Sequence, residues 1–196
     1  KDWQGFHAVW QEARALNLAV MQTLLEQGIP AVSFAPSAMV SASSREVISW
    51  NVEPIRAALS HGLVPVIFGD VIFDQALGGT ILSTEDLFMH LAQRVIPSRI
   101  LLAGIDTGVW RNYGQKDELI PTITPDGFTA ILAHLEGSKS TDVTGGMLSK
   151  VELMVKLVQL VPQLECRIFN GLQPGLLSAV LSGETAGTRI AESACD

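Results

Sequence analysis

The chain has 196 residues, of which 47% are hydrophobic and 17% charged. This composition excludes intrinsic disorder, and its 17 Gly and 9 Pro without a short period exclude a collagen-like chain. The net charge is −7, from 13 Lys and Arg against 20 Asp and Glu, which argues against binding to the phosphate backbone of a nucleic acid. A small phosphorylated ligand stays compatible with this charge, since backbone N–H groups and a few lysines suffice to bind it.

No apolar run approaches the roughly 18 residues that cross a bilayer, so we expect no membrane partner. The two cysteines, Cys166 and Cys195, are far apart and lack metal-ligand spacing. We therefore expect neither a zinc site nor a disulfide framework, and a cytoplasmic location. The first residues carry neither a signal-peptide pattern nor an initiator Met, and this predicts a processed or truncated chain.

The first part of the chain alternates helices with short apolar strands. Val9, Ala13 and Leu16 begin a helical apolar spacing, and Gly28 is a suitable helix stop. In chain order, the predicted elements are a helix over 6–27, a strand over 29–34, a helix over 51–60, and strands over 63–68 and 71–74, with turns at 69–70 and 78–79.

The second part continues this alternation. Ser83 and Asp86 have the spacing of a capping box, which predicts a helix that ends before Pro97. The elements predicted after it are a strand over 99–104, a loop over 111–124, helices over 125–135 and 147–161, a strand over 166–169, a helix opened by Pro174, and a last strand over 187–190. Apolar strands separated by helices predict an α/β fold, with a mainly parallel sheet covered on both faces.

The most specific local pattern lies in residues 140–150, where two adjacent glycines precede a predicted helix. Gly145 and Gly146 lack a Cβ, so their N–H groups can approach an anion, and the helix start adds partial positive charge. Lys150 lies one turn further and can reach the same anion, while Thr144 can orient the loop. An ordinary glycine-rich helix start with a solvated lysine is the alternative, and the local pattern leaves both interpretations open.

Two other glycines follow predicted strands. Gly69 precedes Asp70 after the strand over 63–68, and Gly171 follows Asn170 after the strand over 166–169. Ligands bind beyond the carboxyl ends of parallel strands, so both glycines are candidate ligand contacts. Taken alone, each is also explained by a tight turn.

Taken together, these segments resemble the amino acid kinase superfamily, and within it the archaeal-type isopentenyl phosphate kinases. The resemblance runs from about residue 5 to residue 190, and its segments are 28–38, 64–71, 141–150, 170–175 and 187–190. It implies a three-layer αβα sandwich in one continuous domain. Residues 1–80 would form the phosphate-acceptor half, incomplete at its N-terminus, and residues 81–196 the nucleotide-binding half.

The resemblance implies phosphoryl transfer from ATP, with Mg²⁺, to isopentenyl phosphate, in a homodimer. No covalent intermediate is required, so positioning and charge neutralisation supply the catalysis. The catalytic residues it implies are Lys150 and Glu85, and no side chain is assigned as a metal ligand. The implied nucleotide-binding residues are Asp106, Thr144, Gly145, Gly146, Met147 and Lys150. The implied acceptor-binding residues are Gly69, Asp70, Phe6, Val9, Trp10, Ile72 and Ile81, the apolar ones as a wall for the isoprenoid tail.

The sequence departs from the family pattern in three places. The family's Lys-Gly-Gly loop, and a second glycine-rich loop with a histidine, precede the matched region and are not in these 196 residues. Residues 83–85 read Ser-Thr-Glu where the family has Ser-Gly-Asp, and residues 104–110 replace two carboxylates but leave Asp106 at a shifted position. Two alternatives therefore stay open. One is a kinase of this superfamily with another phosphate, phosphonate or carboxylate acceptor, and the other is a degenerate fold that binds a nucleotide without catalysis.

Overall fold

The computed structural model describes residues 2–111, 116–135 and 143–193. The chain divides into two compact units, Lys1–Val95 and Ile96–Asp196. The N-terminal unit extends through helix α4 (Thr84–Val95), because Leu87 and Leu91 of α4 are buried in the N-terminal core. The division into acceptor and nucleotide halves at residue 80 stays a prediction.

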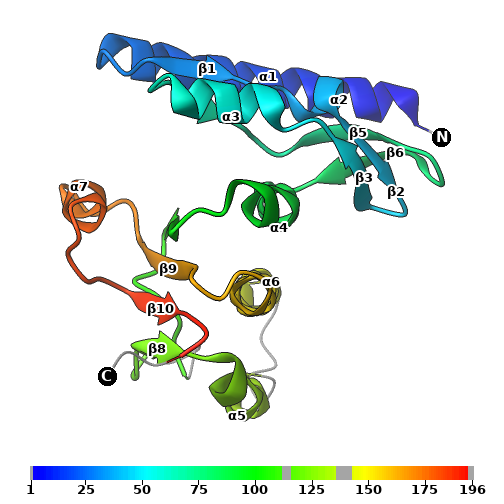
Figure 1. Ribbon diagram of the computed structural model, residues 1–196. Coiled ribbons are helices and arrows are strands. Elements are labelled where there is room, and N and C mark those ends of the chain that lie inside the picture. Colours follow the sequence, from blue (N-terminus) through cyan, green and yellow to red (C-terminus); the bar gives the residue numbers. More distant parts are fainter. Residues whose placement is uncertain (1, 112–115, 136–142, 194–196) are drawn as a thin grey trace. The chain divides into compact units, whose positions relative to one another are not determined.

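The N-terminal unit contains ten elements (Figure 1). In order they are α1 (Trp3–Glu26), β1 (Ala31–Ser33), α2 (Pro36–Met39), β2 (Val40–Ser43), β3 (Glu46–Trp50), α3 (Glu53–Ser60), β4 (Val64–Val66), β5 (Asp70–Asp74), β6 (Gly78–Leu82) and α4. Strands β1 and β4 form a parallel pair, and a second sheet has the order β3-β2-β5-β6. In that sheet β2 and β5 are parallel, while β2–β3 and β5–β6 are antiparallel hairpins.

The sequence patterns located most of these elements, with two errors. The β2–β3 hairpin and α2 were not predicted, and the turn expected at residues 78–79 is the start of β6. A Cβ on Gly79 would lie 2.8 Å from Cδ2 of Phe6, so the glycine allows α1 to approach the strand. The predicted capping box of α4 is confirmed, because Asp86 accepts from the Ser83 amide at 2.9 Å and the Asp86 amide donates to Ser83 Oγ at 3.1 Å.

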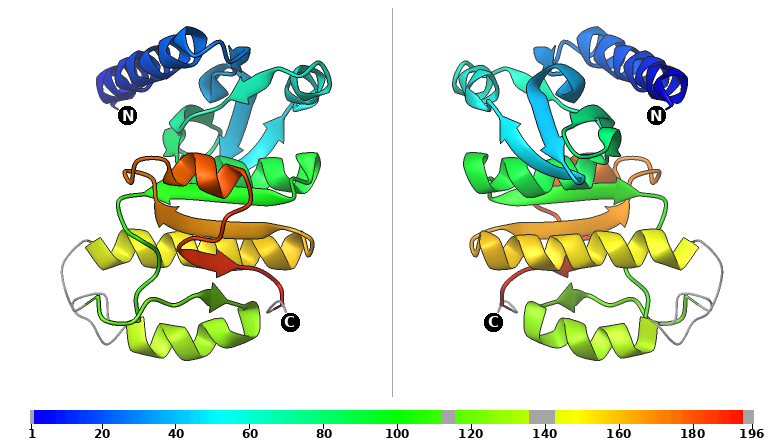
Figure 2. Two further views of the ribbon diagram at one scale, coloured as in Figure 1. Left: turned by 90° about the vertical axis from the view of Figure 1, so that its left-hand side faces the viewer. Right: turned by 90° about the vertical axis from the view of Figure 1, so that its right-hand side faces the viewer.

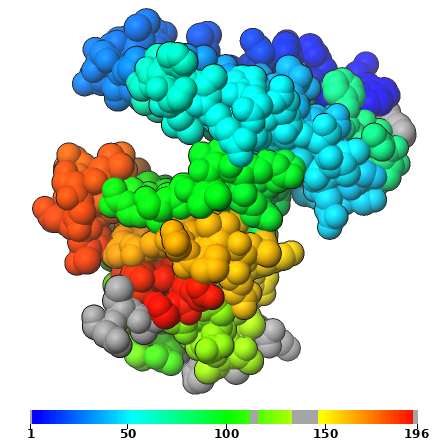
Figure 3. Space-filling view, viewed as in Figure 1, coloured from blue at the N-terminus to red at the C-terminus, as the bar shows by residue number. Residues whose placement is uncertain are grey.

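Helix α1 is an unusual helix for a folded unit, because none of its residues is buried. Its large apolar side chains remain open to solvent, with Leu16 69%, Leu18 67% and Leu25 75% exposed. In the space-filling view of Figure 3, α1 lies on the surface of the N-terminal unit. In contrast, Trp50, Ile55, Ile72 and Leu82 lie in the core of this unit.

In the C-terminal unit, the described strands form a sheet with the order β7-β9-β10-β8. Its elements are β7 (Arg99–Gly104), β8 (Thr122–Ile123), α5 (Pro125–Leu135), α6 (Val143–Leu160), β9 (Glu165–Asn170), α7 (Leu176–Leu181) and β10 (Thr188–Ile190). The β7–β9 and β8–β10 pairs are parallel, and β9–β10 is antiparallel. Helix α6 runs beside β9 in the opposite direction (Figure 2) and buries Val151, Met154 and Leu157.

The predicted α/β class is confirmed, although the sheets are mixed because short hairpins interrupt the parallel pairing. Two boundaries in the C-terminal unit also differ from the prediction. The long helix begins at Val143 rather than at residue 147, and β8 lies within the segment that we expected to be loop. Among the described residues, no helix is long and apolar enough to cross a membrane.

Candidate active site

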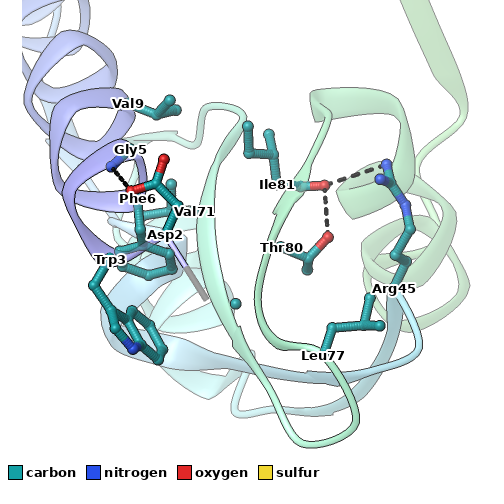
Figure 4. Close-up of a pocket in the computed structure, with 11 residues that line it drawn as sticks. Asp2, Trp3, Gly5, Phe6, Val9, Arg45, Val71, Leu77, Thr80 and Ile81 are labelled. Carbon is teal, nitrogen blue, oxygen red and sulfur yellow. Dashed lines mark hydrogen bonds between the residues drawn. The ribbon is translucent and has the colours of Figure 1, made fainter.

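A pocket of about 500 Å³ lies between the start of α1 and the β5–β6 hairpin (Figure 4). Three of the predicted acceptor-binding residues, Phe6, Val9 and Ile81, line it. Figure 4 shows Phe6 and Val9 on one side of the pocket and Ile81 on the other. The remaining lining residues are Asp2, Trp3, Gly5, Arg45, Val71, Leu77, Gly79 and Thr80. An apolar group is therefore the chemistry that this pocket fits best.

Ile72, a predicted acceptor-binding residue, does not line this pocket. Ile72 is fully buried in the core of the N-terminal unit, next to residues such as Val40 and Leu82. Successive strand residues point to opposite faces of a sheet, so its neighbour Val71 lines the pocket instead. Val71 pairs in register with Ile81, and this cross-strand pair forms part of the pocket wall.

Gly69 lies against the junction between β6 and α4. A Cβ at this position would be 3.3 Å from the carbonyl oxygen of Leu82 and 3.4 Å from the amide of Thr84. Glu85 follows in the first turn of α4 and is half-buried. The structure thus brings Gly69 and the predicted catalytic residue Glu85 to the same junction, from segments that are far apart in the sequence.

The Asp70 carboxylate is 1% exposed and already bound by backbone amides. Its Oδ2 accepts from the Ser37 amide at 3.0 Å, and its Oδ1 accepts from the Val71 amide at 2.9 Å. Asp70 therefore fixes the start of α2 beside β5, and its oxygens do not point freely into a ligand site. In the structure Asp70 holds the amide of Ser37, and its predicted contact with substrate stays a prediction.

Asp74 holds two turns that line the pocket. Its Oδ1 accepts from the amides of Ser44 (3.1 Å), Ala76 (2.9 Å) and Leu77 (2.8 Å), and its Oδ2 accepts from the amide of Arg45 (2.8 Å). Burial raises the pKa of Asp74, but these amide hydrogen bonds outweigh burial, so its pKa lies below the ordinary value. Ser44 and Arg45 have positive φ angles of 53° and 69°, and the Asp74 contacts stabilise this turn.

In the C-terminal unit, the two adjacent glycines lie inside the first turn of α6 rather than before it. The helix begins at Val143, so the first N–H groups, which have no partner within a helix, include those of Gly145 and Gly146. A Cβ on Gly146 would meet no atom within 4 Å, so the backbone there is open to approach. Lys150 is exposed one turn further along. Met147 is half-buried, whereas the side chain of Thr144 lies outside the described residues.

The carboxyl ends of β7 and β9 lie side by side, since Gly104 pairs with Asn170. The Gly171 amide donates to the carbonyl of Gly104 at 2.8 Å, and a Cβ on Gly171 would lie 2.7 Å from Cβ of Ala103. Because α6 runs opposite to β9, its N-terminus lies at this same edge of the sheet (Figure 2). The same edge of the sheet therefore holds Asn170, Gly171 and the first turn of α6. It is the edge at the carboxyl ends of the parallel strands, where ligands bind in folds of this class.

Asp106 follows β7 at this edge and is 8% exposed. Its Oδ1 lies 2.7 Å from Nζ of Lys116, a residue that the sequence analysis did not identify. The segment around Lys116 was predicted only as a loop, and no local pattern pairs it with Asp106. Among the described residues, no group of three or more His, Cys, Asp and Glu side chains forms a metal site.

The comparisons with known proteins agree on one family. Residues 2–170 match the amino acid kinase family. The isopentenyl phosphate kinase of Methanothermobacter thermautotrophicus is 34% identical over 189 residues, which cover 95% of this chain and 70% of that protein. The isopentenyl phosphate kinase of Haloferax volcanii is 35% identical over 192 residues, covering 96% and 71%.

A solved isopentenyl phosphate kinase structure has a TM-score of 0.78 and 30% identity, and the match covers 95% of this chain and 70% of that one. A substrate complex of an isopentenyl phosphate kinase, at 22% identity and a TM-score of 0.72, supports the fold alone. The chain therefore belongs to the amino acid kinase family, and within that family to the isopentenyl phosphate kinases.

Proposed function

We propose that this protein transfers the γ-phosphoryl group of ATP to isopentenyl phosphate, which gives isopentenyl diphosphate and ADP. The observation that carries the proposal is the similarity to isopentenyl phosphate kinases along 95% of the chain. The apolar pocket lined by Phe6, Val9 and Ile81 supports it, because an isoprenoid tail needs such a wall.

The reaction forms a bond between an oxygen of the acceptor phosphate and the γ-phosphorus, and it breaks the bond from that phosphorus to ADP. Catalysis consists of alignment and neutralisation of charge. In this proposal the amides of Gly145 and Gly146 and the Lys150 ammonium bind the ATP phosphates. The amide of Gly69 binds the acceptor phosphate, and Glu85 organises the junction beside it.

Mg²⁺ enters this proposal as part of the Mg·ATP substrate. Mg²⁺ commonly keeps several waters and binds through substrate phosphates, and the proposal places it there. Asp106 is the buried carboxylate at the sheet edge, and its ion pair with Lys116 already balances its charge. We therefore assign no protein side chain as a metal ligand.

The test is turnover of isopentenyl phosphate with Mg·ATP by the complete gene product, compared with Lys150→Ala. Loss of charge stabilisation of the transferring group should lower kcat roughly 10²–10³-fold. Lys156→Ala is the matched control, since Lys156 is an exposed lysine on the same helix and should retain full activity. An unchanged rate for Lys150→Ala would reject its assigned role, and no turnover by the unsubstituted protein would reject the proposed reaction.

A panel of acceptors distinguishes this reaction from that of a related kinase with a polar acceptor. The predominantly apolar lining of the pocket favours an isoprenoid tail over a second carboxylate or phosphonate. We expect kcat/KM to be highest for the isoprenoid phosphate. Calorimetry with Mg·ATP tests the remaining alternative, because a degenerate fold that binds nucleotide without catalysis would give binding but no product.

The proposal includes a homodimer and a cytoplasmic location. Leu18 and Leu25 are two turns apart on one face of α1 and are 67% and 75% exposed. This face supports a partner surface, since exposed apolar side chains on one face of a soluble protein commonly mark an interface. Light scattering should give twice the monomer mass, and Leu25→Glu should shift the protein toward monomer if α1 forms the interface. Cys166 is a free, buried thiol, and burial raises its pKa to about 12.

A further inference from the structure

A second pocket in the N-terminal unit, of about 430 Å³, is also lined by Phe6. Its lining differs from that of the first pocket because it includes a cationic side chain, Arg14, and a hydroxyl group, Ser37. The other lining residues are Phe6, His7, Trp10, Ala35, Ala38 and Phe73. We call this the Arg14 pocket.

Arg14 is held on the wall of this pocket by Trp10. Its guanidinium carbon lies 4.8 Å from the centroid of the indole ring, a cation–π contact. The His7 ring stacks near the same indole, with centroids 5.7 Å apart. Among the described residues, no carboxylate forms an ion pair with the Arg14 guanidinium. In a chain of net charge −7, an arginine placed this way keeps its N–H donors available to an anion.

The Arg14 pocket is also tied to the predicted phosphate end of the acceptor site. Ser37 lines the pocket, and its amide is held by Asp70, the residue after Gly69. Phe6 lines both pockets and stacks near Phe73 at a centroid distance of 5.2 Å. Phe6 and Trp10 are one helical turn apart, roughly 6 Å along α1, which is comparable to the length of a five-carbon chain.

We infer that Arg14 is an acceptor-binding residue that contacts the phosphate group, while the apolar tail passes Phe6 into the first pocket. The ligand class is a phosphate monoester of a short apolar alcohol, which needs a cation at one end and an apolar wall at the other. The inference rests on the proposed function for the identity of the acceptor. It adds a contact that neither the sequence pattern nor the family motifs indicated.

The experiment compares Arg14→Ala, Arg14→Lys and Arg56→Ala in steady-state kinetics of the complete gene product. Arg14→Ala should raise the KM for isopentenyl phosphate roughly 10- to 100-fold, because a charge-assisted hydrogen bond is lost. Its kcat and its KM for ATP should stay within about twofold of the unsubstituted values. Arg14→Lys should recover part of the loss, since the charge is kept but the bidentate geometry is not. Arg56→Ala removes an exposed arginine on α3 and should change none of these parameters.

Calorimetric titration with isopentenyl phosphate alone separates failure of the inference from failure of the proposed function. A KM and a Kd for the acceptor that are equal in Arg14→Ala and Arg56→Ala would overturn the assignment of Arg14, even with full turnover. If the unsubstituted protein shows no turnover, the proposed reaction fails, and the Kd values for isopentenyl phosphate then decide the inference. Arg14 is exposed and lies within a helix, so an alanine there should leave the fold intact.

Discussion

The two units of this protein stabilise their buried and half-buried carboxylates in different ways. In the N-terminal unit, Asp70 and Asp74 are bound by backbone amides. In the C-terminal unit, Asp106 is paired with Lys116, and Glu165 with Arg167 and Arg189. Hydrogen bonds from backbone amides to a carboxylate fix the path of the main chain. A lysine or arginine side chain, in contrast, can leave its carboxylate and bind another anion, such as a phosphate.

This difference matches the roles that we propose for the two units. The acceptor pocket needs a fixed shape, and its turns at residues 44–45 and 76–77 are held by one carboxylate, Asp74. The nucleotide edge has to accept and release a highly charged ligand. An exchangeable pair such as Asp106 and Lys116 suits that purpose, because Lys116 is about half exposed, at 52%.

The largest expected effect comes from Asp74→Ala, which removes the acceptor of four backbone amides at once. The four amides would lose their shared acceptor, and the turns at residues 44–45 and 76–77 would lose the group that fixes them, so the N-terminal unit should lose thermal stability. Asp74→Asn keeps one carbonyl oxygen as an acceptor, so its melting temperature should lie between those of Asp74→Ala and the unsubstituted protein. Differential scanning calorimetry measures the three melting temperatures. Equal values for all three proteins would show that the hydrogen bonds from these amides to Asp74 do not stabilise the unit.

An intermediate effect is expected from the pH dependence of the N-terminal unit. The His90 ring stacks near Trp50 with centroids 5.8 Å apart, and burial together with the charge of Arg94 lowers the pKa of His90 to about 4. An unfolded histidine titrates near 6.5, so between these values the unfolded chain binds more protons than the folded one. Stability should therefore fall as the pH drops from 6.5 toward 4.

The free energy of unfolding should fall by about 1–2 kcal/mol over this pH range, a figure that allows for screening by solvent. Urea unfolding, followed by tryptophan fluorescence at pH 7 and pH 4.5, measures it. His90→Phe keeps an aromatic ring against Trp50 but removes the titrating group. A variant whose pH dependence between these values matches that of the unsubstituted protein would show that His90 does not cause it.

The smallest effect is expected from Glu165→Gln in the C-terminal unit. Burial raises the pKa of Glu165, but hydrogen bonds from Arg189 and Arg167 outweigh this and hold the pKa below its ordinary value. The carboxylate therefore stabilises the fold at neutral pH, and this contribution is lost as the pH falls below the ordinary pKa.

We expect Glu165→Gln to lower the free energy of unfolding by about 1 kcal/mol at low salt. The decrease should be smaller in 1 M NaCl, because salt screens the ion pairs of Glu165 with Arg167 and Arg189. Chemical unfolding at both salt concentrations measures the difference. Glu53→Gln is the control, since its ion pair with Arg56 is exposed and should contribute little. A salt response of Asp74→Ala as large as that of Glu165→Gln would remove the contrast between the two units.

Local sequence patterns predicted much of the C-terminal unit. The strand over residues 99–104 and the helix over residues 125–135 were located with their observed bounds, because strand and helix periodicity are properties of neighbouring residues. In the N-terminal unit, the capping box of Ser83 and Asp86 formed as predicted for the same reason. The start of α6 was misplaced because the two glycines suggested a loop, whereas the helix continues through them.

The candidate site was only partly predictable. Phe6, Val9 and Ile81 were assigned to the acceptor wall through the family resemblance, and they line one pocket. Ile72 was assigned with them but does not line it, and the family motif gives no information on which side of the strand faces α1. Arg14 was missed, since nothing near it in the sequence marks it as part of a pocket.

By itself, the sequence determined the order and type of most elements and the family, since these depend on residues close together in the chain. Only the tertiary structure decided that Asp74 binds the turn at residues 44–45, that Asp106 pairs with Lys116, and that Arg14 shares a pocket with Ser37. Those contacts join residues that are distant in sequence. They arise when packing brings a buried charge to the nearest donor, and no local pattern encodes that outcome.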